Sequence, residues 1–183
     1  IAMSATLDVE PLATYLEAET IRCPGQPHPV AVEHLRRPDD RPLAVQVKEA
    51  VLRMVDEGAP GHLLVFLPGA SEIRAAEASL RPWAECHGVD LRPLHGSLSF
   101  EAQRAAVAPS ERRKVILSTN VAESSLTVEG VQTVVDSGLG REAVHVPDVG
   151  LTRLRTVRVS QARCHQRAGR AGRLGPGRCL RLF

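Results

Sequence analysis

The chain has 183 residues, of which 43% are hydrophobic and 24% are charged. This is an ordinary globular composition, and no apolar run approaches the ~20 residues of a membrane-spanning helix, which argues against a membrane protein. The net charge is +2, but residues 141–183 carry +8 through ten arginines and two acids, which leaves −6 for residues 1–140. A basic C-terminal quarter favours a polyanionic partner.

The cysteines indicate a reducing environment. Cys23, Cys86, Cys164 and Cys179 form no C-x-x-C pair, which argues against a zinc site and against a disulfide framework. No signal-peptide pattern opens the chain. We therefore expect a cytoplasmic protein with no metal site on this chain. Because strand-like sequence follows Ile1 at once, we also expect the chain to be an excerpt of a longer protein.

The first 29 residues are expected to stand apart from the rest. Residues 1–6 resemble a short strand, residues 8–17 have the leucine spacing of a helix, and residues 20–23 resemble a second strand. Residues 24–29 contain three prolines, which is typical of a linker. We therefore place a domain boundary after residue 29.

Strand-like and helix-like stretches then alternate. Short β-branched or apolar runs predict strands at residues 30–35, 62–67, 90–94, 114–118 and 131–136. Apolar residues at helical spacing predict helices at residues 42–57, 71–85 and 99–107. This alternation is typical of a parallel sheet sandwiched by helices, so the predicted fold class is α/β.

The pattern changes after Asp136. Residues 142–146 and 151–159 are strand-like and flank Pro147-Asp148-Val149-Gly150, a turn sequence. We expect a β-hairpin with Arg153 and Arg155 on one face. A helix at residues 160–174 and a strand at residues 179–183 would complete the chain.

Residues 166–173 read Gln-Arg-Ala-Gly-Arg-Ala-Gly-Arg. If residues 160–174 are helical, Gln166, Arg170 and Arg173 fall at positions i, i+4 and i+7 and share one face. Guanidinium groups match the geometry of phosphate and keep their charge. This face therefore predicts an oxyanion site.

The glycines of the same stretch need an explanation. Gly169 and Gly172 each cost about 1 kcal/mol against alanine in a helix interior. Their presence indicates that a strand, a ligand or another domain approaches the backbone closely. A basic surface helix, or a Gly-Arg tract that wraps RNA without folding, is the alternative interpretation.

Three strands of the predicted sheet are followed by small or hydroxyl-bearing residues. In a parallel α/β sheet, ligands bind beyond the carboxyl ends of the strands. Small residues let a nucleic-acid backbone approach, and hydroxyls, amides and backbone N–H groups bond phosphate oxygens. Each stretch alone is a common tight turn, but the three together predict a groove. The stretches are Pro68-Gly69-Ala70, His95-Gly96-Ser97 and Ser118-Thr119-Asn120.

Residues 121–127 continue the third stretch with more polar side chains than a plain connection needs, which indicates a functional loop. The sequence contains no G-x-x-x-x-G-K-[ST] phosphate loop, no acidic pair obviously placed for Mg²⁺ and no Ser-His-Asp arrangement. Composition and periodicity alone therefore predict an α/β domain with an anion-binding arginine face, and they do not predict an enzyme.

The motifs, taken in chain order, resemble those of the DEAH-box helicases of superfamily 2. They are Ser4-Ala5-Thr6, residues 66–73, residues 94–98, residues 118–127 and residues 166–173. Residues 150–154 and 158–162 further resemble the bacterial HrpB-type branch. The resemblance covers essentially the whole chain.

The resemblance implies RecA-like domains of the P-loop NTPase type. Residues 1–29 would be the end of a first such domain with its linker, and residues 30–183 the complete second domain with a β-hairpin insertion. The phosphate loop and the DEAH motif would lie upstream of Ile1. The hairpin around residues 147–150 would be the strand-separating hairpin of the family.

The resemblance also implies a role for each site residue. Gln166, Arg170 and Arg173 would reach the γ-phosphate of ATP across the domain cleft, with the two arginines as fingers that neutralise charge in the transition state. Arg167 would orient the helix. Ser125, Thr127 and Glu129 would face the nucleotide. The RNA backbone would be contacted by Gly69, Ser97, Thr119 and Asn120. Ser4 and Thr6 would couple the nucleotide state to domain closure.

The implied activity is that of an ATP-dependent RNA helicase. It would use ATP or another nucleoside triphosphate together with Mg²⁺, and both would need the first RecA-like domain. The implied partners are RNA, as a single strand or a duplex with an overhang, and the first RecA-like domain in cis, with no membrane. The chain alone is expected to lack ATPase activity.

Two departures from the family pattern matter. Val107 stands where many DEAH proteins place an aromatic residue against the adenine base, which predicts loose nucleotide selectivity. Gln26 replaces an arginine that is usual in the linker.

Two other functions remain open. A binding or scaffolding module would keep the fold and the RNA groove without turnover. Such a module would not need the arginines that are expected to contact the γ-phosphate. A DNA-directed motor is also compatible, because backbone contacts alone do not reveal a preference for the 2′-OH.

Overall fold

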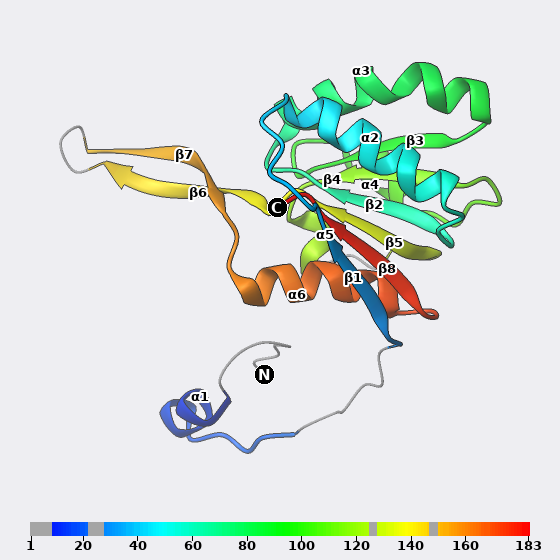
Figure 1. Cartoon of the computed structure of the whole chain (residues 1–183). Coiled ribbons are helices and arrows are strands. Elements are labelled where there is room, and N and C mark those ends of the chain that lie inside the picture. Colours follow the sequence, from blue (N-terminus) through cyan, green and yellow to red (C-terminus); the bar gives the residue numbers. More distant parts are fainter. Residues whose placement is uncertain (1–8, 22–27, 125–127, 147–149) are drawn as a thin grey trace.

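Six parallel strands form the central sheet in the order β1-β8-β5-β2-β4-β3 (Figure 1). The computed structural model describes residues 9–21, 28–124, 128–146 and 150–183. The strands are β1 (Val30–His34), β2 (His62–Phe66), β3 (Asp90–Leu94), β4 (Lys114–Ser118), β5 (Val131–Asp136) and β8 (Gly177–Arg181). The predicted α/β class with a parallel sheet is confirmed.

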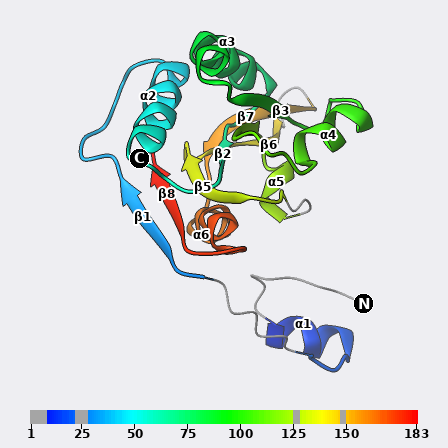
Figure 2. The same ribbon diagram turned by 90° about the vertical axis from the view of Figure 1, so that its right-hand side faces the viewer.

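Helices cover both faces of this sheet (Figure 2). The first face is covered by α2 (Leu43–Asp56) and α3 (Ala70–His87). The second face is covered by α4 (Phe100–Val107), α5 (Val121–Ser124) and α6 (Gln161–Gly169). The predicted helices of this region are confirmed, and Ser99 caps α4 by accepting a hydrogen bond from the backbone N–H of Ala102.

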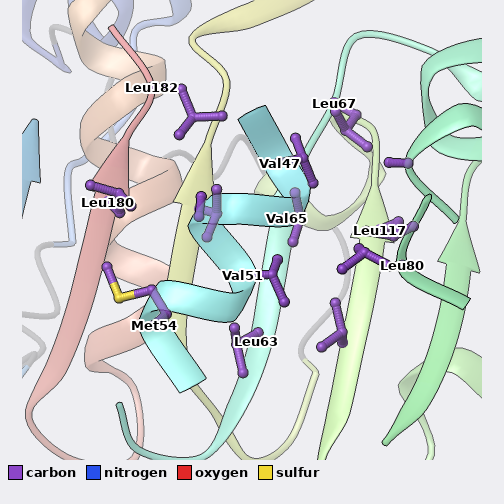
Figure 3. Packing of buried hydrophobic residues seen from close by; sticks show 14 of the residues in the cluster. Val47, Val51, Met54, Leu63, Val65, Leu67, Leu80, Leu117, Leu180 and Leu182 are labelled. Atoms are coloured by element: carbon purple, nitrogen blue, oxygen red, sulfur yellow. The ribbon is translucent and has the colours of Figure 1, made fainter. Parts of the chain in front are cut away.

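Strand β2 shows how the sequence builds two cores. Leu63 and Val65 pack toward α2 and α3, whereas Leu64 and Phe66 pack toward the helices of the second face. All four side chains are at most 1% exposed, which explains why this strand is almost entirely apolar. Figure 3 shows the first core, in which Val47, Val51 and Met54 of α2 belong to the same cluster as Leu63 and Val65 of β2, Leu117 of β4 and Leu180 of β8.

The helix predicted at residues 160–174 is shorter than expected. Helix α6 begins after Ser160, whose hydroxyl accepts a hydrogen bond from the N–H of Arg163, and it ends at Gly169. A single 3-10 turn, η2 (Arg170–Gly172), follows. The carbonyl of Gly172 accepts a hydrogen bond from the N–H of His28, 2.9 Å away, so the chain that leads into β1 docks on this turn.

Strands β6 (Leu139–Val146) and β7 (Leu151–Arg158) form an antiparallel two-stranded sheet that projects from the body of the molecule (Figure 1). The predicted hairpin is confirmed, although its first strand begins three residues earlier than the predicted 142. Arg153 and Arg155 share one face, because their cross-strand partners alternate along β6.

Helix α1 (Val9–Leu16) confirms the helix predicted at residues 8–17, and none of its residues is buried. The strand predicted at residues 20–23 is wrong for Thr20 and Ile21, which belong to no strand; Ile21 is 88% exposed and so gains no packing there. Residues 1–6 and 24–27 lie outside the described residues, and the domain boundary at residue 29 stays a prediction. None of the described helices combines the length and apolar character needed to cross a membrane.

Candidate nucleotide and nucleic-acid site

Arg170 and Arg173 converge on one small pocket, whose apolar wall is formed by Leu64, Ala122, Val128 and Val131. Arg170 is 6% exposed, and Arg173 is exposed. The expected convergence of the two arginines is present, but a continuous helix is not its cause. A 3-10 turn has three residues per turn, so side chains three positions apart project to the same side. Gln166 lies half-buried on the last part of α6.

The surroundings of Arg170 suit an anion. Its guanidinium donates twice to the backbone carbonyl of Glu123, and the Nε–O distance is 2.9 Å. Burial lowers the pKa of Arg170 to about 10; the neighbouring charge of Arg173 acts in the same direction, and the charge of Glu123 acts in the opposite one. Arg170 therefore stays charged at neutral pH while it is repelled by Arg173. A phosphate group between two guanidinium groups would relieve this repulsion.

The carboxylate of Glu123 anchors helix α6. Arg163 donates through Nε to Oε1 at 2.7 Å, and Arg167 donates through Nε to Oε2 at 3.0 Å. Burial alone would raise the pKa of Glu123, but the hydrogen bonds from these arginines outweigh burial and hold the pKa below 4.5. Glu123 thus stays ionised and connects α5 to α6.

Arg167, which was expected to orient the helix, is completely buried. Its Nη1 donates to Oδ1 of Asp136 at 2.8 Å and to the carbonyl of Leu139 at 3.1 Å, and its guanidinium lies 4.9 Å from the ring centroid of Phe66. One side chain therefore joins α6 to the end of β5 and to the first residue of the hairpin. The sequence did not indicate the roles of Glu123, which lies in α5, and Asp136, which ends β5.

The three small or hydroxyl-bearing stretches lie at one edge of the sheet, as predicted. They follow β2, β4 and β3, which are consecutive neighbours. The N–H of Leu67 donates to the carbonyl of Ser118 at 2.8 Å, and the N–H of Thr119 donates to the carbonyl of Leu94 at 3.2 Å. Ser97 and Asn120 are exposed at this edge, and Thr119 is half-buried.

Gly69 has a different environment from the other members of this row, because it is buried. A β-carbon on Gly69 would lie 2.7 Å from Cζ and Nε of Arg141, which belongs to the first strand of the hairpin. Arg141 also donates to the hydroxyl of Ser71 at 2.9 Å and forms an ion pair with Glu72 at 3.3 Å. The group that comes close to the glycine backbone is thus this guanidinium, which the sequence did not reveal.

Some predicted site residues lie outside the described part of the chain, namely Ser4, Thr6, Ser125 and Thr127. Glu129 is exposed in the turn before β5.

Val107 is half-buried and packs against the core of the second face. Within the described ranges, no group of three His, Cys, Asp or Glu side chains is placed to hold a metal ion.

The chain is similar to known helicases over its whole length. It is 46% identical over 188 residues to the ATP-dependent RNA helicase HrpB of Escherichia coli, covering all of this chain and 23% of that protein. It is 35% identical over 191 residues to the pre-mRNA-splicing factor ATP-dependent RNA helicase prp22 of Schizosaccharomyces pombe, covering all of this chain and 16% of that protein. The chain thus spans less than a quarter of the length of these relatives.

The fold is also similar to that of a solved helicase. The match with the crystal structure of the Escherichia coli DEAH/RHA helicase HrpB covers 98% of this chain and 23% of the HrpB chain, with a TM-score of 0.88 and 45% identity. Residues 46–175 match the family model of the helicase conserved C-terminal domain. The RecA-like architecture expected from the motifs is confirmed. The chain therefore belongs to the helicase conserved C-terminal domain family, and its expected resemblance to the HrpB-type DEAH helicases is confirmed.

Proposed function

We propose that this chain is the second motor domain of an ATP-dependent RNA helicase and completes an ATP site shared with a first RecA-like domain. The observation that carries this proposal is the convergence of Arg170 and Arg173 on one pocket. The similarity to proteins named as ATP-dependent RNA helicases supports it. In this proposal, residues 1–29 are the end of the first domain and its linker, and residues 30–183 are the second domain.

The arginine face would act on the γ-phosphate. Negative charge on the transferring phosphoryl group is neutralised in the transition state by positively charged side chains that are already in place. Arg170 and Arg173 would supply that charge, and Gln166 would add a polar contact one turn earlier. The phosphate loop and the ligands of Mg²⁺ would come from the first domain. Half-buried Val107 would offer the base little specific contact, so other nucleoside triphosphates would also be accepted.

The sheet edge would carry the RNA backbone. Ser97 and Asn120 present a hydroxyl and an amide at the exposed edge, and Thr119 lies beside them. Such groups bond phosphate and sugar without reading sequence, so binding would be largely independent of sequence and sensitive to salt. A single strand, or a duplex with an overhang, would be the substrate. Gly69 would also belong to the RNA-binding edge, although the guanidinium of Arg141 lies over it.

The remaining roles rest on the family resemblance alone. Ser125, Thr127 and Glu129 would face the nucleotide, and Ser4 and Thr6 would couple the nucleotide state to domain closure. The hairpin would separate strands. A cytoplasmic location also stays a prediction.

The first test is RNA-stimulated ATP hydrolysis by the intact protein, with the wild type compared with Arg173→Ala. We expect kcat to fall by about 10³-fold or more, because arginine fingers contribute that much in phosphoryl transfer. RNA affinity should stay unchanged, and far-UV circular dichroism should confirm that both proteins are folded. Arg112→Ala is the matched control, because Arg112 is exposed just before β4, at the opposite edge of the sheet.

Three outcomes are informative. Equal rates for the wild type and Arg173→Ala would remove the arginine from the transition state. No hydrolysis by the wild type, with RNA binding kept, would favour the scaffolding module. Stimulation by DNA but not by RNA of the same sequence would favour the DNA-directed motor.

A further inference from the structure

We propose that Arg141 contacts the backbone of the bound nucleic acid, and that the strand runs along the hairpin face that carries Arg141. The opposite face, which carries Arg153 and Arg155, would point away from it. This inference rests on the proposed function, because it extends the RNA edge of the sheet onto the hairpin.

The position of Arg141 is the first argument. Its guanidinium lies over Gly69 and contacts Ser71 and Glu72, at the point where β2 ends and α3 begins. That point belongs to the row of strand ends that we assign to the RNA backbone. Arg141 is therefore the place where the hairpin meets the sheet edge.

The register of the hairpin is the second argument. Arg141 pairs with Thr156, and Ala143 pairs with Leu154, so these four residues share a face. His145 pairs with Thr152 farther along the same face. This face contains no acid among these pairs, and Leu154 is 68% exposed, which offers an apolar surface to a base.

The other face has different surroundings. At its root, a β-carbon on Gly140 would lie 3.6 Å from the guanidinium of Arg163 on α6. Glu142 is 3.6 Å from the same guanidinium and pairs across the hairpin with Arg155. This face is therefore turned toward α6, and it carries a carboxylate beside its arginines.

The chemistry of the Arg141 contact favours exchange with phosphate. Its side chain is 36% exposed, and its partner Glu72 is 29% exposed. An ion pair that is open to solvent holds its partners weakly. A guanidinium matches a phosphate with two parallel hydrogen bonds, so a phosphodiester could take the place of the carboxylate.

The test measures the affinity of the intact protein for a fluorescently labelled single-stranded oligouridylate by anisotropy, at several salt concentrations. For Arg141→Gln we expect the binding constant to fall about threefold or more. We also expect the plot of log binding constant against log salt concentration to become less steep by about 0.7, the value for one phosphate contact with a single strand. Arg141→Lys should restore the slope because it restores the charge. Arg155→Gln, on the opposite face, should leave the slope unchanged.

Glu72→Gln separates a phosphate contact from a mere anchor of the hairpin. If Arg141 only anchors the hairpin, loss of its partner should weaken RNA binding as much as loss of Arg141. If Arg141 contacts phosphate, Glu72→Gln should keep or increase the affinity. Equal slopes for the wild type and Arg141→Gln, or parallel losses in Arg141→Gln and Glu72→Gln, would overturn the inference and leave the proposed function intact. A wild-type protein without RNA affinity would overturn both.

Discussion

At the scale of single residues, the two glycines of residues 166–173 have different surroundings, and only one of them has no room for a side chain. A β-carbon on Gly172 would lie 2.5 Å from the carbonyl oxygen of His28 and 2.8 Å from Cγ2 of Val30. A β-carbon on Gly169 would have no described atom within 4 Å, and its φ of −58° suits any residue. The close approach that the sequence indicated is therefore made by the chain leading into β1, and it concerns Gly172.

We predict opposite effects of alanine at these two positions. Gly172→Ala should lower the free energy of unfolding by about 1–3 kcal/mol, because the new methyl group overlaps a backbone oxygen. Gly169→Ala should raise it by about 0.4–1 kcal/mol, because alanine restricts the unfolded chain and fits the helical conformation. Urea unfolding of the purified chain measures both, and each variant is the control for the other. A loss of similar size in both variants would contradict this assignment.

At the scale of elements, buried charges fix α6 in place. Glu123 is 8% exposed and receives hydrogen bonds from Arg163 and Arg167, and Arg167 continues to Asp136 at the end of β5. These pairs hold the helix beside the strand from which the hairpin departs. If the proposed function is correct, the same contacts position the arginine fingers.

We predict that Glu123→Gln lowers the free energy of unfolding by about 3 kcal/mol at pH 7, because it removes one of the two carboxylates that are bonded to the buried guanidinium of Arg167. The pKa of Glu123 is below 4.5 in the folded chain, so its contribution is complete above that pH and is lost as the pH falls through the folded pKa. The difference between the wild type and the variant should therefore narrow below about pH 4.5. Urea unfolding at a series of pH values measures it.

Glu142→Gln is the control for this prediction. The Glu142 side chain is 55% exposed and lies 3.6 Å from Arg163, so its removal should change the stability by less than about 1 kcal/mol. A stability difference for Glu123→Gln that does not depend on pH would show that ionisation of Glu123 is not the source of the stabilisation.

At the scale of the whole molecule, the proposed ATP site is divided between two domains. This chain contains the arginine face, and its sequence contains no G-x-x-x-x-G-K-[ST] phosphate loop. We therefore predict that the isolated chain folds but releases no phosphate from ATP, with or without RNA, whereas the intact protein does. A colorimetric phosphate assay compares the two, with unfolding followed by circular dichroism as the check on folding. Hydrolysis by the isolated chain that Arg173→Ala abolishes would contradict a shared site.

The sequence by itself determined the α/β class and most of the strands, because a strand buried on both faces needs the apolar run seen in residues 62–67. It also determined the hairpin, because alternation and a turn sequence are local signals. The sequence motifs also indicated the resemblance to the DEAH-box helicases. These predictions depend on residues that are close together in the chain.

Only the tertiary structure decided what docks on the turn after α6 and which charges meet. The N–H of His28, more than a hundred residues earlier, donates to the carbonyl of Gly172 in the turn that follows α6. Arg141 covers Gly69 and Arg167 reaches Asp136 through contacts between distant segments, which no local pattern encodes. The sequence offered candidate site residues but not the partners of their charges, because a buried charge is paired by the fold that surrounds it.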